Sequence, residues 1–411
     1  MMTSRLVIFA LTYALIAVQH FPGLRINRPG ASLLGAVAMV VVGRLPLREA
    51  YAAIDLDVIT FLLGMLLLTG YLELGGFFEW AAAHIVERMS SPRPLLAAIV
   101  ALSGLLSALF INDTICLVFT PLVITALRSL GLRPLPFLLA IALASNVGSA
   151  MTITGNPQNM LIGVSSGIRF ATFTAALALP ALGGLVIVYL VIALVYRKEL
   201  SVLPEAPTDR LRYDFDRTLV LKTLAVFVGA VACWLAGLSL PLVAITAGAL
   251  MMAIARRDAA DAFAKVEWSL LLFFAALFVL MRGVRDLPLF VDLTSRAAAK
   301  LYGTPLHDGL VVSATMTVLS NLVSNVPAVL LWLPVMPQLP NARLVWLVMA
   351  MSATFAGNLT LLGSMANLIV AERATARGVP LHFRDYLRVG LPTTLLTLAW
   401  GVATLVLLPR R

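Results

Sequence analysis

Long apolar runs, separated by short polar segments, make up most of the sequence. A helix needs about 20 apolar residues to cross the hydrocarbon core of a bilayer, so this pattern predicts an all-α polytopic membrane protein. In the first half of the chain, spans are predicted near 5–20, 31–47, 57–73 and 171–196. In the second half, they are predicted near 219–236, 240–256, 267–283 and 386–407.

Two further apolar runs are interrupted by polar residues near their centres. The run at about 92–128 contains Asn112-Asp113-Thr114, and the run at about 307–337 contains Ser324-Asn325. Each apolar piece is marginal for a full crossing, which favours a re-entrant helical hairpin with the polar residues at its tip. Non-helical backbone is tolerated at this depth only where it is buried in protein or lines a water-filled cavity. Amphipathic stretches that are predicted to lie in the membrane interface precede both hairpins, near 75–89 and 286–302.

Two more apolar runs are broken by glycine and proline. Gly155 and Pro157 interrupt the run at about 135–165, and Gly357 begins the interruption of the run at about 343–372. The polar side chains that accompany each break cannot all face lipid. Each run is therefore predicted to be a discontinuous helix whose unwound centre meets a hairpin tip.

The two halves of the chain share one plan. Asn112 corresponds to Asn325, and Pro121 corresponds to Pro334 at the same spacing. Each half contains five spans and one hairpin, and an odd number of crossings places the halves in opposite orientation, as in the inverted repeats of many secondary transporters. The predicted division is a first repeat at 1–196, a cytoplasmic linker at 197–217 and a second repeat at 218–411.

Composition and charge agree with a membrane protein. Only 12% of the residues are charged, against about 25% in soluble domains. The net charge of +10 does not indicate nucleic-acid binding, because the basic residues lie in short loops. One side of the predicted topology holds about 18 Lys and Arg residues and the other about 11, and the positive-inside rule places the richer side in the cytoplasm. Both termini then lie outside, and the Asp113 hairpin enters from the cytoplasm.

The two hairpin tips and two helix breaks are predicted to converge near the bilayer midplane. There, half-helix N-termini offer N–H groups to an anion or a polar neutral solute. Their side chains are candidates for binding substrate or a coupling ion, although they could instead only satisfy the broken helix ends. The candidates in the first repeat are Asn112, Asp113, Thr114, Ser145, Asn146, Thr152, Gly155, Asn156 and Asn159. Those in the second repeat are Ser324, Asn325, Gly357, Asn358, Thr360, Gly363, Ser364 and Asn367.

Asp113 is the sharpest candidate, because an ionisable side chain inside a membrane run marks a transport or proton-relay site by default. Burial favours the protonated form of a carboxyl, so Asp113 is a candidate proton carrier, whereas a bound Na⁺ would make it a cation ligand. The second hairpin has Val326 at the corresponding position, so the two tips are not equivalent. Cys116 is a candidate contact for a thiophilic solute. The two cysteines have no metal-ligand spacing, so no metal site and no cofactor is expected beyond transported H⁺ or Na⁺.

These segments resemble the ion transporter superfamily, which includes divalent anion/sodium symporters, NhaD-type sodium/proton antiporters, the melanosomal P protein and ArsB-type arsenite pumps. Asn112-Asp113 followed by an apolar run to Thr120-Pro121 is similar to the ArsB and P-protein branch. The stretches 75–84 and 357–367 resemble ArsB segments, the second through its Thr-x-x-Gly-Ser pattern. The stretch 154–159, Thr-Gly-Asn-Pro-Gln-Asn, is closer to the P-protein and general anion-permease form.

The resemblance implies an alternating-access transporter, elevator-like or rocking, whose hairpins and broken helices enclose the site. It favours proton-coupled efflux of arsenite or antimonite across a bacterial-type inner membrane, with Asp113 as the proton carrier. Arsenite is mostly the neutral trihydroxide at neutral pH, and the absence of Lys and Arg from the hairpin tips and breaks agrees with a neutral solute. Two alternatives stay open: a sodium- or proton-coupled transporter of a small anion such as a dicarboxylate or sulfate, and a sodium/proton antiporter.

Other classes of protein fit less well. A channel does not explain two opposed hairpins that close one site. The sequence has no GxxxxGK[ST] motif, no HExxH motif and no Ser-His arrangement within the spans, so no enzyme and no catalytic residue is indicated. A soluble ATPase partner is compatible with the ArsB resemblance. The chain is expected to be a monomer or a homodimer in lipid, without a nucleic-acid partner.

Overall fold

The computed structural model describes residues 2–18, 27–89, 91–202, 213–301, 303–339 and 341–407. These residues form helices joined by short connections, and no strand occurs among them. Within the described ranges, six helices are long and apolar enough to cross a membrane, or seven if the bent pair α13 and α14 counts as one span. The six are α4 (Leu56–Leu74), α6 (Pro92–Leu109), α10 (Phe170–Val195), α11 (Arg217–Leu235), α16 (Pro305–Val323) and α20 (Phe383–Leu407). The prediction of an all-α, multi-pass membrane protein is confirmed.

The remaining helices are shorter, and they follow the predicted order in both repeats. In the first repeat they are α1 (Met2–Val18), α2 (Arg28–Val41), α3 (Leu47–Ala53), α5 (Phe77–Arg88), α7 (Asn112–Ser129), α8 (Leu135–Ser149) and α9 (Pro157–Ser166). After the short helix η1 (Glu199–Ser201), the second repeat adds α12 (Leu240–Ile254), α13 (Ala259–Lys265), α14 (Trp268–Val284), α15 (Pro288–Ala298), α17 (Asn325–Trp332), η2 (Met336–Gln338), α18 (Ala342–Ala356), η3 (Leu361–Gly363) and α19 (Met365–Thr375).

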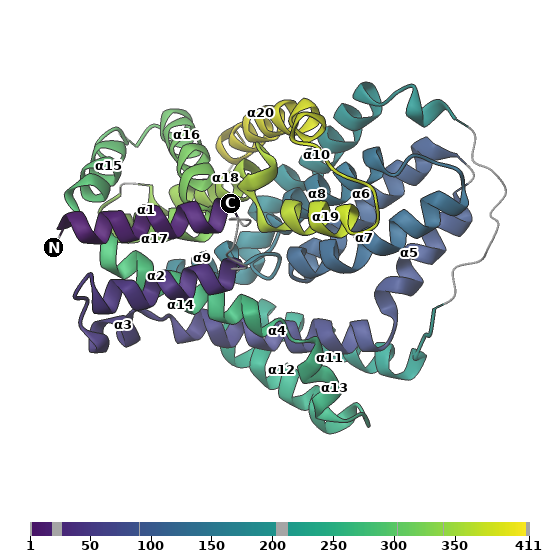
Figure 1. Ribbon diagram of the computed structural model, residues 1–411, viewed down its shortest axis with the longest axis horizontal. Coiled ribbons are helices and arrows are strands. Elements are labelled where there is room, and N and C mark those ends of the chain that lie inside the picture. The colour runs from purple at the N-terminus through teal and green to yellow at the C-terminus, as the bar shows by residue number, and fades with distance from the viewer. Residues whose placement is uncertain are drawn as a thin grey trace.

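The two repeats are inverted relative to each other. Figure 1 shows α5, α6 and α7 toward one end of the molecule and their counterparts α15, α16 and α17 toward the opposite end. The pairing of the outer helices has the same symmetry, because α4 packs along α12 while its counterpart α14 packs along α2. Each repeat thus completes its helix packing with a helix of the other, and neither half is a self-contained bundle.

The hairpins and broken helices occur where the polar interruptions predicted them. The first hairpin is α6 and α7, which are joined at Phe110 and Ile111, and the second is α16 and α17, which are joined at Ser324. The broken helices are α8 with α9 and α18 with α19. The first arm of each hairpin is as long as a full span, so these arms are longer than the marginal pieces expected from the sequence.

Local chemistry fixes where the second half of the first broken helix begins. Pro157 is the first residue of α9, where its missing N–H costs no intrahelical hydrogen bond. The side chain of Asn156 caps α9 by accepting from the Asn159 N–H at 2.9 Å. The second half of the broken helix therefore starts at a defined residue rather than fraying into the break.

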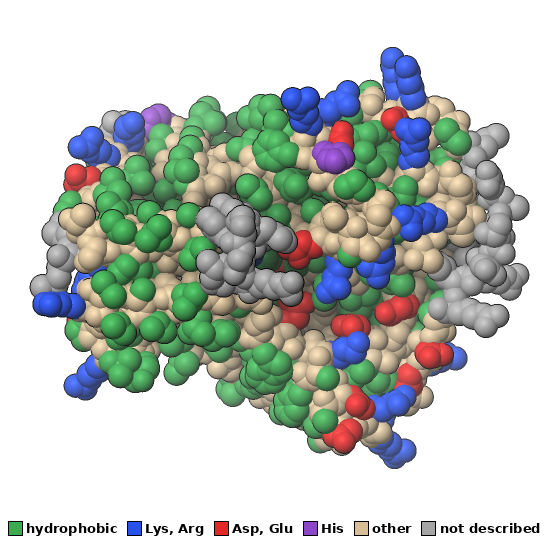
Figure 2. All heavy atoms as spheres, viewed as in Figure 1, with side chains coloured by type: hydrophobic (Ala, Val, Ile, Leu, Met, Phe, Trp, Pro, Cys, Tyr) green, Lys and Arg blue, Asp and Glu red, His purple; other side chains and the backbone are tan. Residues whose placement is uncertain are grey.

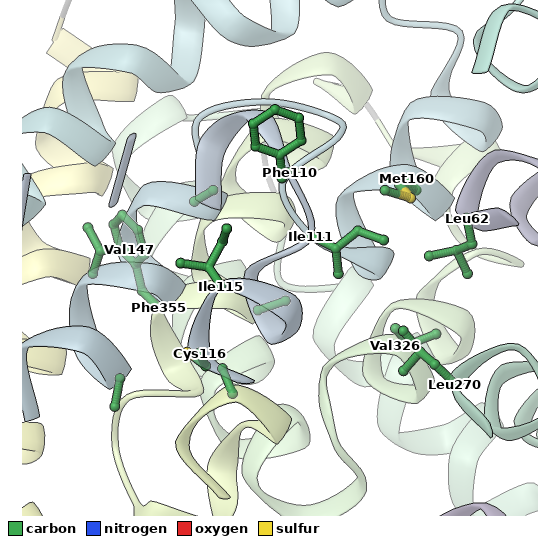
Figure 3. Packing of buried hydrophobic residues seen from close by; sticks show 14 of the residues in the cluster. Leu62, Phe110, Ile111, Ile115, Cys116, Val147, Met160, Leu270, Val326 and Phe355 are labelled. Atoms are coloured by element: carbon green, nitrogen blue, oxygen red, sulfur yellow. The ribbon is translucent and has the colours of Figure 1, made fainter. Parts of the chain in front are cut away.

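Buried hydrophobic side chains pack beside these polar elements. Phe110 and Ile111 at the first hairpin tip are buried, as are Val147 beside the first break and Val326 beside the second tip (Figure 3). On the outside, Figure 2 shows hydrophobic side chains over much of one face, while Lys, Arg, Asp and Glu gather toward the part that contains α13 and α19. The predicted linker at 197–217 lies partly outside the described residues, which omit 203–212.

Close helix contact beside the first break depends on two glycines. A Cβ added at Gly148 of α8 would meet the backbone of Gly104 on α6, and backbone atoms cannot rotate away. The small residue at this position therefore sets how closely the broken helix approaches the hairpin. Gly229 on α11, by contrast, has open space where a Cβ would be placed.

Replacing Gly148 by alanine is expected to lower the thermal unfolding temperature of the purified protein in detergent, because overpacking costs about 1–3 kcal/mol. Gly229→Ala is the matched control, and it is expected to raise stability by up to about 1 kcal/mol through its better helix propensity. Intrinsic tryptophan fluorescence during heating measures both variants. Equal unfolding temperatures for the two variants would contradict the close contact.

Candidate functional site

The first hairpin tip is hydrogen-bonded to the first helix break. The Asn112 N–H, at the start of α7, donates to the Gly155 carbonyl at 3.0 Å. On the other side of the tip, the hydroxyls of Thr152 and Thr154 donate to the carbonyl of Ala108 near the end of α6. Backbone groups that would otherwise be unsatisfied in an apolar environment are thereby paired, and the tip is held at the depth of the break.

Asn146 joins elements of both repeats. Its Nδ2 group donates to Asn358 Oδ1 at 2.8 Å and to Asn367 Oδ1 at 3.0 Å. Its Oδ1 atom accepts from Asn112 Nδ2 at 3.0 Å and from Ser364 Oγ at 2.9 Å. One fully buried amide therefore connects the first hairpin tip, the first broken helix and the second break.

The second cross-link between the repeats has related geometry. Asn156 Nδ2 donates to Ser149 Oγ at 2.9 Å and to Thr354 Oγ1 at 3.3 Å, and Gln158 Nε2 donates to the same threonine at 3.1 Å. Thr354 lies on α18, the counterpart of α8. Each broken helix thus accepts hydrogen bonds from the break of the other repeat.

Two asparagines close the breaks internally. Asn159 Nδ2 donates to the carbonyls of Ser149, Ala150 and Thr152 at 3.3, 3.3 and 2.9 Å. Its counterpart Asn367 donates to the carbonyls of Gly357 and Thr360 at 2.8 and 3.3 Å. These amides replace the hydrogen bonds that the helix loses where it unwinds.

A cavity of about 150 Å³ lies where the polar elements converge. Four helix N-termini contribute to its wall, through the first residues of α7, α9, α17 and α19. Helix N-termini carry partial positive charge and unpaired N–H groups, which favour oxygen-rich or anionic solutes. The polar lining residues are Tyr13, Arg28, Asn112, Asp113, Gln158, Ser320, Asn321, Ser324, Asn325 and Ser364.

Several buried polar atoms in this wall have no protein partner. Asn112 Oδ1, Ser320 Oγ and Asn325 Oδ1 make no hydrogen bond to any described residue. Leaving such atoms unsatisfied costs about 1–3 kcal/mol each. A bound solute or water that offers hydroxyl donors would satisfy them, so the wall is suited to hydrogen bonding.

Five of the predicted site residues line the cavity, namely Asn112, Asp113, Ser324, Asn325 and Ser364. The other candidates do not line it, and most of them satisfy helix ends or one another. These are Thr114, Ser145, Asn146, Thr152, Gly155, Asn156, Asn159, Gly357, Asn358, Thr360, Gly363 and Asn367. Cys116 does not line it either, because its sulfur lies 3.0 Å from Ser145 Oγ in the core, as its position in Figure 3 shows.

Arg28 adds a cationic side chain to the cavity wall, although the hairpin tips and the helix breaks themselves contain no Lys or Arg. It begins α2, and its sequence position indicated only a loop charge. Asp113 and Arg28 interact electrostatically within the wall. Among the described residues, no group of three His, Cys, Asp or Glu side chains could hold a metal ion. The structure therefore gives the site one carboxylate and one guanidinium.

The second hairpin tip has strained backbone. Ser324 has φ 71° and ψ 162°, a region that is essentially limited to glycine and costs about 1–3 kcal/mol for other residues. The first tip, at Phe110 and Ile111, has ordinary extended backbone. The two tips differ in conformation as well as in the Asp113-to-Val326 difference between their sequences.

Inverted repeats with broken helices around a buried polar cavity define the class of secondary transporters. The family is more particular: residues 13–353 match CitMHS, described as "Citrate transporter", and the chain belongs to this family. The chain is 32% identical to "Silicon efflux transporter LSI3" of Oryza sativa subsp. japonica, over 96% of each protein. It is 25% identical to "Putative transporter arsB" of Dictyostelium discoideum, over 96% of this chain and 89% of that protein.

A solved structure agrees on the fold. The crystal structure of the Alcanivorax borkumensis YdaH transporter, whose title notes an unusual topology, aligns with a TM-score of 0.57 over 98% of this chain and 96% of that one. The sequence identity is 15%, so this likeness concerns architecture alone. The resemblance to the ion transporter superfamily is confirmed, and the chain is a multi-pass membrane transporter rather than an enzyme.

Replacing Asn146 by alanine is expected to remove its four side-chain hydrogen bonds, three of which join the repeats. Each bond inside a membrane protein contributes about 0.6–2 kcal/mol, so the unfolding temperature in detergent should fall clearly. Thr125→Ala is the control, since this exposed threonine bonds only to the carbonyl of Pro121 in its own helix. An Asn146→Ala protein as stable as the Thr125→Ala protein would show that the cross-link is dispensable.

Proposed function

We propose that this transporter exports a small, uncharged metalloid hydroxide, arsenite or antimonite, in exchange for protons. The observation that carries the proposal is the cavity, with one carboxylate, Asp113, among hydroxyls, amides and helix N-termini. Arsenous acid offers hydroxyl donors to the oxygens of Asn112, Asn325 and Asp113, and its own oxygens face the helix N-termini. This wall therefore complements a polyhydroxylated solute.

The size of the cavity supports a small solute. An engineered protein cavity of about 150 Å³ binds benzene, and this cavity has a similar volume of about 150 Å³. Arsenous acid is smaller than benzene, whereas citrate is larger and carries three negative charges at neutral pH. The single guanidinium in the wall would leave most of that charge unpaired at a buried site.

The names of two relatives also support export of a neutral hydroxide. One is described as a silicon efflux transporter and the other as a putative transporter arsB. Dissolved silicon at neutral pH is the neutral tetrahydroxide, and arsenite is the neutral trihydroxide. A site that binds uncharged hydroxides through hydrogen bonds is common to both chemistries.

Asp113 gives this site a means of proton coupling. The ionised carboxylate accepts a hydrogen bond from a solute hydroxyl, and protonation turns one oxygen of the same group into a donor. Proton and solute then compete for one group, so loading with a proton on one side of the membrane favours release of the solute there. The positive-inside distribution of Lys and Arg orients the chain with both termini outside a bacterial-type plasma membrane.

A second candidate is supported by the positive groups of the wall. Four helix N-termini and Arg28 would bind a small anion when Asp113 is protonated. Proton-coupled transport of a compact anion such as sulfate or a dicarboxylate is therefore the alternative. It differs from metalloid export in the charge of the solute and in the direction of solute movement, because the anion would move with the proton and not against it.

Everted membrane vesicles that contain the protein are expected to accumulate arsenite when the lumen is made acidic, and a protonophore should abolish this accumulation. Asp113→Asn is expected to lose gradient-driven accumulation by about tenfold or more, which corresponds to at least about 1.4 kcal/mol of lost coupling. The control is Asp57→Asn, the same chemical change at an exposed position in the first turn of α4.

Proton-driven uptake of labelled sulfate or succinate, without arsenite accumulation, would replace this proposal by the anion alternative. Gradient-driven accumulation of arsenite by Asp113→Asn at the wild-type level would remove Asp113 from proton coupling.

A further inference from the structure

Arg28 connects the outer helices to the helices that form the cavity. It is the first residue of α2, whose start is fixed by the Asn27 side chain accepting from the Gly30 N–H at 3.0 Å. Helix α2 packs against α1 and α14, outside the hairpins and broken helices. The Arg28 side chain reaches the second broken helix, because its Nη1 group lies 2.8 Å from the sulfur of Met365, the first residue of α19.

The same guanidinium faces the carboxylate that carries the proton in the proposed function. Arg28 and Asp113 line one cavity, and they interact electrostatically. A guanidinium stays charged under all physiological conditions, so this attraction varies with the charge of Asp113 and with what lies between the two groups. Protonation of Asp113 removes the attraction, and a bound solute separates the charges.

We propose that Arg28 is a coupling residue: its charge attracts ionised Asp113 and opposes movement of the hairpins and broken helices when the cavity holds neither proton nor solute. This inference rests on the proposed function of Asp113 as proton carrier. An exchanger must suppress movement of its empty form, because an empty carrier that returns freely lets solute run down its gradient without protons. The Arg28–Asp113 attraction supplies this restraint, because it joins two separately packed groups of helices: α2 packs against α1 and α14, whereas α7 packs against α5, α6, α8 and α19.

Two other carboxylates act on this pair: Glu372 acts more strongly on Arg28 than Asp113 does, and Glu267 acts more strongly on Asp113 than Arg28 does. Helix α8 carries no ionisable side chain, and Arg93 of α6 lies in the first turn, at the end opposite the hairpin tip. The remaining ionisable groups on the elements around Asp113 and Arg28 are Arg5 and Tyr13 of α1, Glu79, His84 and Arg88 of α5, Arg128 of α7, Glu267 before α14, Arg282 of α14, and Glu372 and Arg373 of α19. Of the described residues that line the cavity, Arg28 alone is a cation.

A labelling experiment without solute tests the restraint directly. Cys116 and Cys233 are replaced by serine, and a reporter cysteine is placed at Leu362, which lines the cavity and is 54% exposed. A membrane-impermeant maleimide is applied to right-side-out and to everted vesicles at mildly alkaline and mildly acidic pH. The ratio of labelling rates from the two faces reports the exchange between conformations, and it cancels the intrinsic pH dependence of the thiol.

In the wild-type background, labelling from the less accessible face is expected to be slow at alkaline pH and to rise several-fold on acidification. In Arg28→Gln, the rate of labelling from the less accessible face, relative to that from the other face, is expected to be raised at both pH values. Asp113→Asn should do the same. The double variant should show no further increase, because both changes remove one interaction. Arg28→Lys, which keeps the charge, should retain the pH dependence, and Arg48→Gln at an exposed position should resemble wild type.

Two results would overturn the proposal: a wild-type pH dependence in Arg28→Gln, or a labelling ratio that does not depend on pH in the wild-type background. If Arg28→Gln does not fold, loss of the pH dependence in Asp113→Asn together with its retention in Arg28→Lys supports the same restraint. The measurement uses no solute. A failure of arsenite transport with the expected labelling pattern would therefore reject the substrate assignment and leave the role of Arg28 standing.

Discussion

Breaking a helix inside the hydrocarbon core leaves N–H and C=O groups that water cannot satisfy. These groups must find hydrogen-bond partners within the protein, and this requirement governs the packing of both repeats. Side-chain amides supply the missing partners: Asn159 and Asn367 bind the carbonyls of the two breaks, and Asn156 caps α9. Asn146 then joins the breaks across the repeats. Since each break depends on the other repeat, the cavity between them requires both halves to be folded together.

This solution leaves a particular set of groups for the solute. Carbonyls of the breaks are largely used by asparagine side chains, whereas the beginnings of four helices face the cavity. The wall is therefore positive in its backbone dipoles, and Asp113 and Arg28 add one charge of each sign. A site of this kind changes its net charge by one unit when a single proton binds, so one proton is enough to alter its preference for a solute.

The repeats are alike in backbone plan and different in chemistry. The first tip carries Asp113 where the second has Val326, and the second tip has strained backbone at Ser324. Inverted repeats give a transporter two related conformations, but only one tip has an ionisable group. In the proposed exchange, the proton therefore binds to the first repeat, while the strained second tip contributes Ser324 and Asn325 to the cavity wall.

Apolar length and polar interruption are local properties of a membrane chain, so the helices, the hairpins, the broken helices and their inverted arrangement could be predicted from sequence. The same pattern grouped Asn112, Asp113 and Asn325, which line one cavity in the structure. Which polar residues line the cavity and which satisfy helix ends depends on tertiary packing. Asn146 and Ser364 are both polar residues in a broken helix, but only Ser364 lines the cavity. Arg28 entered the site through the packing of α2 against α14, a contact between distant segments that no local pattern records.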